Sequence, residues 1–132
     1  MSEENVKATR DAVEAFNVGM DEFMATHTGD VELVPDPMWP EQGPFRGRDE
    51  VRRWWEQILE QYESHENVLD DVASVDEHRV LMNGRWHVRG QGSGVTTTLT
   101  YSAVLTLREG LVCRFQFFFD RQKALEAAGL SE

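Results

Sequence analysis

Three consecutive segments in the second half of the chain alternate apolar and polar residues with a period of two. Because successive side chains of a β-strand point to opposite faces, this alternation predicts strands with one buried face and one exposed face. The residues predicted for the buried face are Met82, Gly84, Trp86 and Val88 in the first segment, Leu99, Tyr101, Ala103, Leu105 and Leu107 in the second, and Cys113, Phe115, Phe117 and Phe119 in the third. An antiparallel sheet with so large an apolar face has to be covered, and only the first half of the chain is available to cover it.

The first half shows apolar residues at helical spacing instead. A first helix begins near Ser2 and is broken by Gly19, a short second helix carries Met20, Phe23 and Met24, and a third helix runs from Arg48 to Tyr62. The remaining predicted elements are an end to the second helix at Thr28-Gly29, a brief strand over Val31–Val34, a loop over Met38–Gly47, a weaker edge strand over Ser64–Val75, and a short C-terminal helix capped by Asp120. We therefore predict a single α+β domain over residues 1–132, in which three N-terminal helices cover the concave face of a curved, mostly antiparallel sheet.

The charge and composition of the chain exclude several classes of function. The net charge of −11 disfavours nucleic acid and an anionic membrane surface as partners, because phosphate binding requires clustered basic residues. The densest basic run, Arg48, Arg52 and Arg53, is interleaved with acidic residues and is typical of a solvated helix face. No apolar run has membrane-spanning length, and the four histidines lack metal-binding spacing, so we expect no membrane anchor, no metal and no cofactor. The single cysteine, Cys113, forms no intramolecular disulfide, and with the acidic N-terminus it predicts a cytoplasmic location.

Four local segments lie at the element boundaries of this order of helices and strands. They are Phe16-Asn17-Val18-Gly19, the run from Asp30 to Pro37, the run from Phe45 to Val51, and Arg108-Glu109-Gly110 followed by Arg114-Phe115 and Phe119-Asp120. Together with the order of elements, they resemble the SnoaL-like family of the nuclear-transport-factor-2-like (NTF2-like) superfamily. The resemblance implies a cone whose inward sheet face and third helix line a pocket. Proteins of this fold include isomerases, cyclases, hydrolases, dehydratases and binders without activity, so the fold alone names no function.

The candidate site follows from the predicted faces and from this cone. Large apolar groups on a loop and on two covered faces predict a pocket for a small hydrophobic molecule. The predicted lining residues are Trp39, Trp54, Trp55, Met82, Trp86, Phe117 and Phe119. An alternative interpretation is that these side chains simply fill the cone and leave no space for a ligand.

Two further residues are candidates for chemistry, Asp36 as a general base and Tyr101 as a donor that polarises a ligand carbonyl. Asp36 lies between two prolines just past the first strand, and a carboxylate shielded by aromatic side chains suits a base working near neutral pH. Alternatively, Asp36 bonds the backbone of its own turn and Tyr101 is satisfied by the backbone.

Within this resemblance, missing residues argue against two of the reaction classes that the fold hosts. Asp36-Pro37 is similar to the proton-shuttling turn of the ketosteroid isomerases, but Ala12 and Ala103 stand where that site places its oxyanion donors. The acid–arginine–acid set of the limonene-epoxide-hydrolase type is also missing, because His87 and Phe117 replace acids near Arg85. Polyketide cyclases of the SnoaL type rely on one carboxylate and on shape, and they fit better.

Two functions therefore stay open: an isomerase or cyclase-type enzyme acting on a hydrophobic cyclic or polyketide-like substrate, and a binding or accessory domain without turnover. We also expect a homodimer. Val104, Val112 and Phe118 interrupt the polar outer face of the predicted sheet, and apolar patches of this kind are usually covered by a partner.

Overall fold

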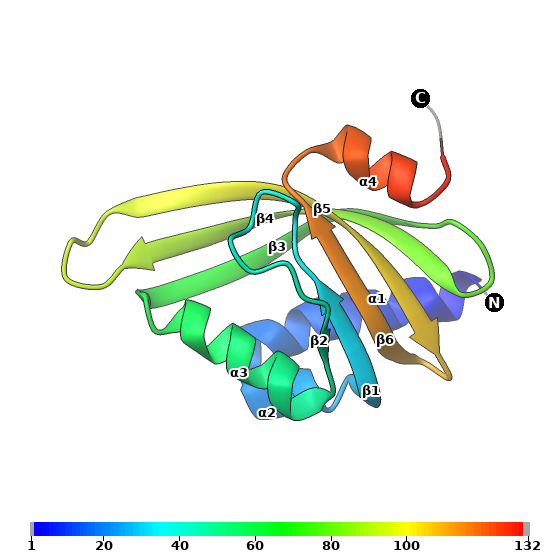
Figure 1. Ribbon diagram of the computed structural model, residues 1–132, viewed down its shortest axis with the longest axis horizontal. Coiled ribbons are helices and arrows are strands. Elements are labelled where there is room, and N and C mark those ends of the chain that lie inside the picture. The colour runs from blue at the N-terminus through cyan, green and yellow to red at the C-terminus, as the bar shows by residue number, and fades with distance from the viewer. Residues whose placement is uncertain (1, 131–132) are drawn as a thin grey trace.

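The computed structural model describes residues 2–130, which form one six-stranded sheet and four helices (Figure 1). The helices are α1 (Ser2–Val18), α2 (Met20–Met24), α3 (Arg48–Leu59) and α4 (Arg121–Ala127). The strands are β1 (His27–Val34), β2 (Phe45–Arg46), β3 (Tyr62–Ser74), β4 (Arg79–Gly90), β5 (Thr96–Arg108) and β6 (Leu111–Phe118).

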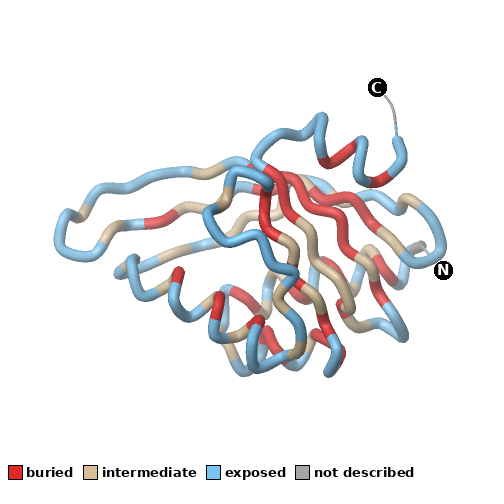
Figure 2. Tube along the Cα trace, in the orientation of Figure 1, coloured by how far each residue is buried: buried red, intermediate tan, exposed pale blue. Residues whose placement is uncertain are grey.

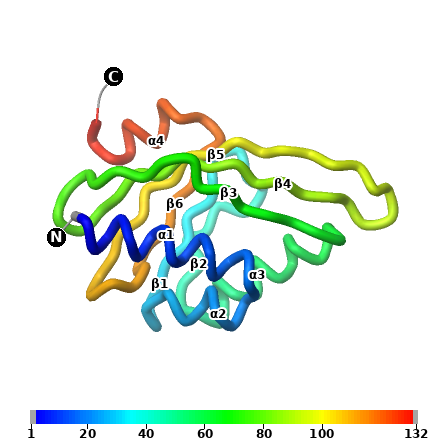
Figure 3. Tube along the Cα trace, turned by 180° about the vertical axis from the view of Figure 1, so that it is seen from behind, coloured from blue at the N-terminus to red at the C-terminus, as the bar shows by residue number. Residues whose placement is uncertain are grey.

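The sheet has the strand order β2-β1-β6-β5-β4-β3, and only the β1–β6 pair is parallel. Figure 1 shows α1, α2 and α3 together on one side of the curved sheet and α4 on the other. Seen from behind in Figure 3, α1 lies across β3, the edge strand. The predicted α+β architecture, with three N-terminal helices on the concave face and an edge strand before the long hairpins, is confirmed.

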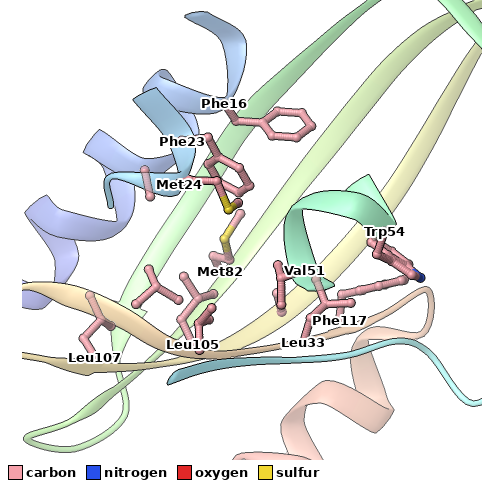
Figure 4. Packing of buried hydrophobic residues seen from close by; sticks show 14 of the residues in the cluster. Phe16, Phe23, Met24, Leu33, Val51, Trp54, Met82, Leu105, Leu107 and Phe117 are labelled. Carbon is pink, nitrogen blue, oxygen red and sulfur yellow. The ribbon is translucent and has the colours of Figure 1, made fainter. Parts of the chain in front are cut away.

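The hydrophobic core lies between the concave face and the three helices. Helix α3 contributes Val51, Trp54 and Ile58 at helical spacing, and all three are buried. In Figure 4, Phe23 and Met24 point toward the sheet residue Met82 across this core. Figure 2 shows that burial concentrates in the middle of the sheet, whereas the tips of β4 and β5 are largely exposed.

The second helix ends earlier than its apolar pattern predicts, and the first strand begins earlier. Helix α2 stops at Met24, and β1 already begins at His27 rather than at Val31. The Phe23 carbonyl accepts hydrogen bonds from the Thr26 hydroxyl at 2.6 Å and from His27 Nδ1 at 2.8 Å, which satisfies the helix end. Val112 then donates its backbone N–H to the Thr26 carbonyl at 2.9 Å, so pairing with β6 begins at once.

Two other boundaries also differ from the prediction. Phe45–Arg46 lies within the predicted loop but forms β2, because Phe45 and Arg46 pair with Leu33 and Glu32 of β1. The third helix ends at Leu59, and Tyr62 begins β3 instead of closing that helix. Both differences arise from pairing with distant segments, which local spacing does not encode.

A register irregularity in β6 corrects the predicted faces of Cys113 and Val112. Leu107 pairs with Val112, but the next pair joins Thr106 to Arg114, so Cys113 is an extra residue on its strand. The bulge places Val112 in the core, 2% exposed, and leaves Cys113 only partly buried. Burial raises the pKa of the Cys113 thiol, which leaves it protonated near neutral pH. The prediction that Cys113 packs in the buried face was wrong, because a shift of one residue exchanges the two faces of a strand.

Helix α4 covers the apolar patch on the outer face of the sheet. Its Leu125 packs with Leu81, Val104 and Phe118 in a second, smaller cluster of buried residues. Asp120 caps the helix as predicted, accepting a hydrogen bond from the backbone N–H of Gln122 at 2.9 Å. The chain itself covers Val104 and Phe118, and Val112 lies inside the core, so these residues no longer argue for a partner. The homodimer stays a prediction without that support.

Candidate functional site

A cavity of about 240 Å³ lies between the concave sheet face and the helices. Every predicted pocket residue except Asp36 lines it. These lining residues are Trp39, Trp54, Trp55, Met82, Trp86, Tyr101, Phe117 and Phe119. All four tryptophans of the chain therefore line the same cavity, and the side chains inside the cone leave an empty space between them.

Aromatic rings contact one another around the whole cavity. Trp54 packs against Trp55 at a centroid distance of 5.0 Å with an interplanar angle of 82°. Trp39 lies 5.5 Å from Trp54, and Phe117 lies 5.9 Å from Trp54. Of these three pairs, only Trp54–Trp55 is edge-to-face, and an aromatic pair of that geometry contributes about 0.5–1.5 kcal/mol beyond the area it buries. The wall is therefore held in shape by its own contacts.

The cavity reaches the surface beside Trp39 and Phe119. Phe119 lines the cavity and is also 44% exposed, and its ring stacks on that of Trp39 with an interplanar angle of 28°. Met38, next to Trp39, is 81% exposed. The loop between β1 and β2 therefore forms one side of the apolar mouth of the cavity.

Asp36 does not line the cavity, contrary to our expectation. Its side chain is 2% exposed, and each carboxylate oxygen accepts a backbone hydrogen bond. Oδ1 accepts from the N–H of Met38 at 2.7 Å, and Oδ2 accepts from the N–H of Phe119 at 2.9 Å. Asp36 thus ties the loop that carries Trp39 to the end of β6, where Phe119 follows. The hydrogen bond from Met38 lies within the turn of Asp36 and matches the alternative interpretation of this residue. The hydrogen bond from Phe119 is one that the sequence pattern did not predict.

Tyr101 lines the cavity, but its hydroxyl already has a partner. It donates to Oδ1 of Asn67 on β3 at 2.8 Å, and burial raises the pKa of the phenol well above its ordinary value. Tyr101 is thus a neutral donor whose hydrogen is used within the protein. Asn67, which the sequence analysis did not single out, joins Tyr101 as a polar residue on the wall.

The sequence missed several other lining residues besides Asn67. They come from α1, α2 and α3 and from the first residue of β3, and they include Ala12, Val13, Phe16, Phe23, Ile58 and Tyr62. Ala12 and Phe16 lie four residues apart on α1 and are both buried, so helical spacing accounts for their facing the sheet. What it did not show is that a space remains between helix and sheet at this point.

The electrostatic character of the cavity is uniform. Among residues 2–130, the side chains that line it include no aspartate, glutamate, lysine, arginine or histidine. His65 lies near the wall, with its ring centroid 5.2 Å from that of Phe16 and 6.3 Å from that of Trp86. Burial lowers the pKa of His65, so its imidazole is neutral near pH 7. The cavity therefore suits an uncharged ligand.

Two of the three arginines in the basic run at the start of α3, Arg48 and Arg52, are bonded within the chain. Arg48 donates to the carbonyl of His27, and Arg52 bridges Asp21 at 2.7 Å and Glu56 at 3.0 Å. In the described part of the chain, no helix is long and apolar enough to cross a membrane. The same residues contain no group of three or more His, Cys, Asp or Glu side chains placed to hold a metal ion.

The comparisons with known proteins agree with this geometry. A family model described as the SnoaL-like domain matches residues 6–115. No curated protein matches the sequence. A putative SnoaL-like polyketide cyclase from Jannaschia sp. CCS1 has a similar structure, with a TM-score of 0.76 and 17% identity over 99% of this chain and 95% of that one.

Two further solved structures that are similar to this chain hold small molecules. TerC, co-crystallized with polyporic acid, matches with a TM-score of 0.76 and 18% identity over 96% of this chain and 98% of that one. The protein RV0760c from Mycobacterium tuberculosis, in complex with estradiol-17beta-hemisuccinate, matches with a TM-score of 0.74 and 12% identity, over 91% of this chain and 95% of that one. At these identities the likeness shows a shared fold.

Proposed function

The chain belongs to the SnoaL-like domain family, and from that premise we propose that it binds a small, uncharged, largely apolar ring compound in its cavity. The observation that carries the proposal is the cavity of about 240 Å³, lined by aromatic side chains and free of charged ones among the described residues. Ligand sites are typically concave and mostly apolar, with few polar groups. The small molecules held by TerC and by RV0760c support the same use of the fold.

The first test is a calorimetric titration of the protein with tetralin, a neutral two-ring hydrocarbon. We expect saturable binding to the wild type. Val13→Phe adds a ring to a residue that lines the cavity, and we expect it to weaken binding at least about tenfold, because that ring occupies the ligand's space. Val18→Phe is the matched control, since Val18 lies on the same helix but is 68% exposed. Equal affinity of Val13→Phe and wild type would place the ligand elsewhere.

A second candidate function is an isomerase or cyclase-type reaction on a hydrophobic cyclic or polyketide-like substrate. The likeness to the putative polyketide cyclase favours it, with Asp36 as general base and Tyr101 polarising the substrate. Binding without turnover has the stronger support, because both oxygens of Asp36 are engaged by backbone N–H groups away from the cavity wall. A base has to reach the proton that it removes.

The two roles of Asp36 predict different effects of Asp36→Asn. If Asp36 positions Trp39 and Phe119 at the mouth, the amide N–H of the variant opposes one backbone donor, and the affinity for tetralin falls severalfold. If Asp36 is a general base, the affinity is unchanged and only turnover of a substrate is lost. Calorimetry on the variant distinguishes the two.

The assembly and the location of the protein complete the proposal. We propose a homodimer in the reducing cytoplasm. The single cysteine of the chain, Cys113, has no disulfide partner within it, which fits a reducing compartment. A monomer mass by light scattering at micromolar concentration would contradict the dimer.

A further inference from the structure

Asn67 on β3 is a polar residue of the cavity wall whose backbone is hydrogen-bonded to helix α1. Its backbone N–H donates to Oδ1 of Asn17 at 2.8 Å, and its carbonyl accepts from Nδ2 of Asn17 at 2.8 Å. Helix α1 therefore fixes the backbone of β3 at this position. Because Asn67 also lines the cavity, its side-chain amide is presented to the interior from a rigid strand.

The side-chain amide of Asn67 is oriented by Tyr101, which lies two strands away. The Tyr101 hydroxyl donates to Asn67 Oδ1 at 2.8 Å across the intervening strand β4. This crossing requires a glycine at position 84, which pairs with Tyr101 in the β4–β5 register. A Cβ at Gly84 would lie 3.0 Å from the Tyr101 hydroxyl oxygen and 3.0 Å from the Val68 carbonyl. Gly84 thus allows the phenol to reach β3.

The oxygen of the Asn67 amide is therefore occupied, and its nitrogen is not. An asparagine amide carries one acceptor oxygen and two N–H donors. In the described chain, Asn67 Nδ2 has no hydrogen-bond partner. The indole nitrogens of Trp54 and Trp86, both on lining residues, are buried and also lack a partner. The two indole nitrogens are shielded within the wall, so Asn67 Nδ2 is the donor of these three that remains available to a ligand.

We propose that the ligand is an uncharged ring compound carrying a ketone-type oxygen, and that Asn67 Nδ2 donates a hydrogen bond to that oxygen. Within this proposal, which rests on the proposed function, Tyr101 is a positioning residue that acts through the Asn67 amide. A carboxylate on the ligand would be buried without a lysine or arginine on the wall. An ammonium group would meet aromatic faces that suit a cation, but it would leave the Asn67 donor without an acceptor.

The test compares three compounds with one two-ring frame: 1-tetralone with a ketone, tetralin without it, and 2-aminotetralin with an ammonium. We expect the wild type to bind 1-tetralone about fivefold more tightly than tetralin, the size of one net hydrogen bond. Asn67→Leu should bring this ratio to about one while the affinity for tetralin changes less than about twofold. Asn83→Leu is the matched control, since Asn83 bonds Asp71 on the outer face and does not line the cavity.

Tyr101→Phe provides a second variant that keeps the ring in place. It removes the bond that orients the Asn67 amide, so we expect the ratio to fall between those of the wild type and Asn67→Leu. Thermal unfolding checks that each variant is folded. If Asn67→Leu does not fold, the ratio of affinities measured with Tyr101→Phe tests the proposal instead. A structural role alone would lower the affinities for all three compounds together and leave their ratio unchanged.

The outcomes separate this inference from the function on which it rests. Equal binding of 1-tetralone and tetralin, or a ratio that survives both Asn67→Leu and Tyr101→Phe, overturns the inference and leaves the proposed function intact. Tightest binding of 2-aminotetralin overturns the class of ligand. Saturable binding of none of the three compounds overturns the proposed function and the inference together.

Discussion

The two faces of the sheet are built from alternate residues of the same strands, yet they are stabilised in different ways. On β5, Leu99, Tyr101 and Leu105 line the cavity on the concave face, while Thr96 and Thr100 are exposed on the convex face. The concave face is held by buried apolar contacts. The open part of the convex face carries exposed ion pairs, such as Arg85 with Asp70 at 2.7 Å. Exposed pairs contribute little because water and salt screen them.

The convex face is itself divided by α4. Under this helix, Leu81, Val104 and Phe118 are buried by Leu125, and beyond it the face is polar. Apolar side chains are thus buried on the concave face and under α4, but not on the open part of the convex face. We therefore expect substitutions to lose most stability on the concave face, less under α4, and least on the open convex face. Four predictions test this order, beginning with the largest effect.

The first prediction concerns Trp54, which is 4% exposed and contacts four other aromatic rings. Trp54→Ala should lower the free energy of unfolding by about 4 kcal/mol, because it removes a large buried side chain and enlarges the cavity. Urea denaturation measures the change. Arg53→Ala, an exposed neighbour on the same helix, should leave stability nearly unchanged. Similar losses for the two variants would refute the contrast between buried and exposed positions.

The second prediction concerns His27, which is 3% exposed on β1. Burial lowers the pKa of its imidazole to about 4. The unfolded chain gains the proton below about pH 6.5, whereas the folded chain gains it only near pH 4, so stability falls as the pH drops through this window. The full loss is about 3 kcal/mol.

His27→Phe removes this titration and keeps an aromatic ring beside Phe23. We expect the difference in stability between pH 7 and pH 4 to be about 3 kcal/mol smaller in the variant than in the wild type, by urea denaturation at both values. The pKa of His65 is also lowered, but His65 is present in both proteins and cancels in the comparison. An identical pH dependence in the two proteins would show that His27 is not buried in its neutral form.

The third prediction concerns the patch under α4. Leu125→Ala should destabilise the protein by about 2 kcal/mol, at the low end for buried leucines, because a short terminal helix relaxes easily around the gap. Lys123→Ala on the exposed side of the same helix is the control. A loss as large as that of Trp54→Ala would place α4 within the main core and remove the division of the convex face.

The fourth and smallest effect is expected for Asp70→Asn on the open convex face. Arg85 lowers the pKa of Asp70 through their shared hydrogen bonds, but both side chains are accessible to water. We expect a slight loss of stability that disappears at high salt. Denaturation midpoints at low and high salt measure it. A loss equal to that of Leu125→Ala would contradict the ranking of the faces.

The fold and most of the cavity wall could be predicted because period-two alternation assigns a face to each residue wherever pairing is regular. Trp86, Tyr101 and Phe117 lie where this rule places them. The rule failed at Val112 and Cys113, because a bulge follows from how β5 and β6 pair and not from the composition of either strand.

Asn67 and Asp36 were beyond the reach of sequence patterns for a related reason. The role of Asn67 depends on Tyr101 crossing β4 above Gly84, which is a relation between three strands. Asp36 meets the backbone N–H of Phe119, 83 residues later in the chain. Residue type and spacing suggested a chemical role for Asp36, whereas the hydrogen-bond partners seen only in the fold point to a positioning role.

A ligand site inside the cone is tested most directly by following the four indole N–H signals by NMR while 1-tetralone is added. All four tryptophans line the cavity, so the signals of Trp39, Trp54, Trp55 and Trp86 should shift together and saturate with one dissociation constant. Backbone signals of the open convex face, such as Thr98 and Thr100, should stay in place. Indole signals that do not move while the convex face responds, or no response at all, would contradict a ligand site inside the cone.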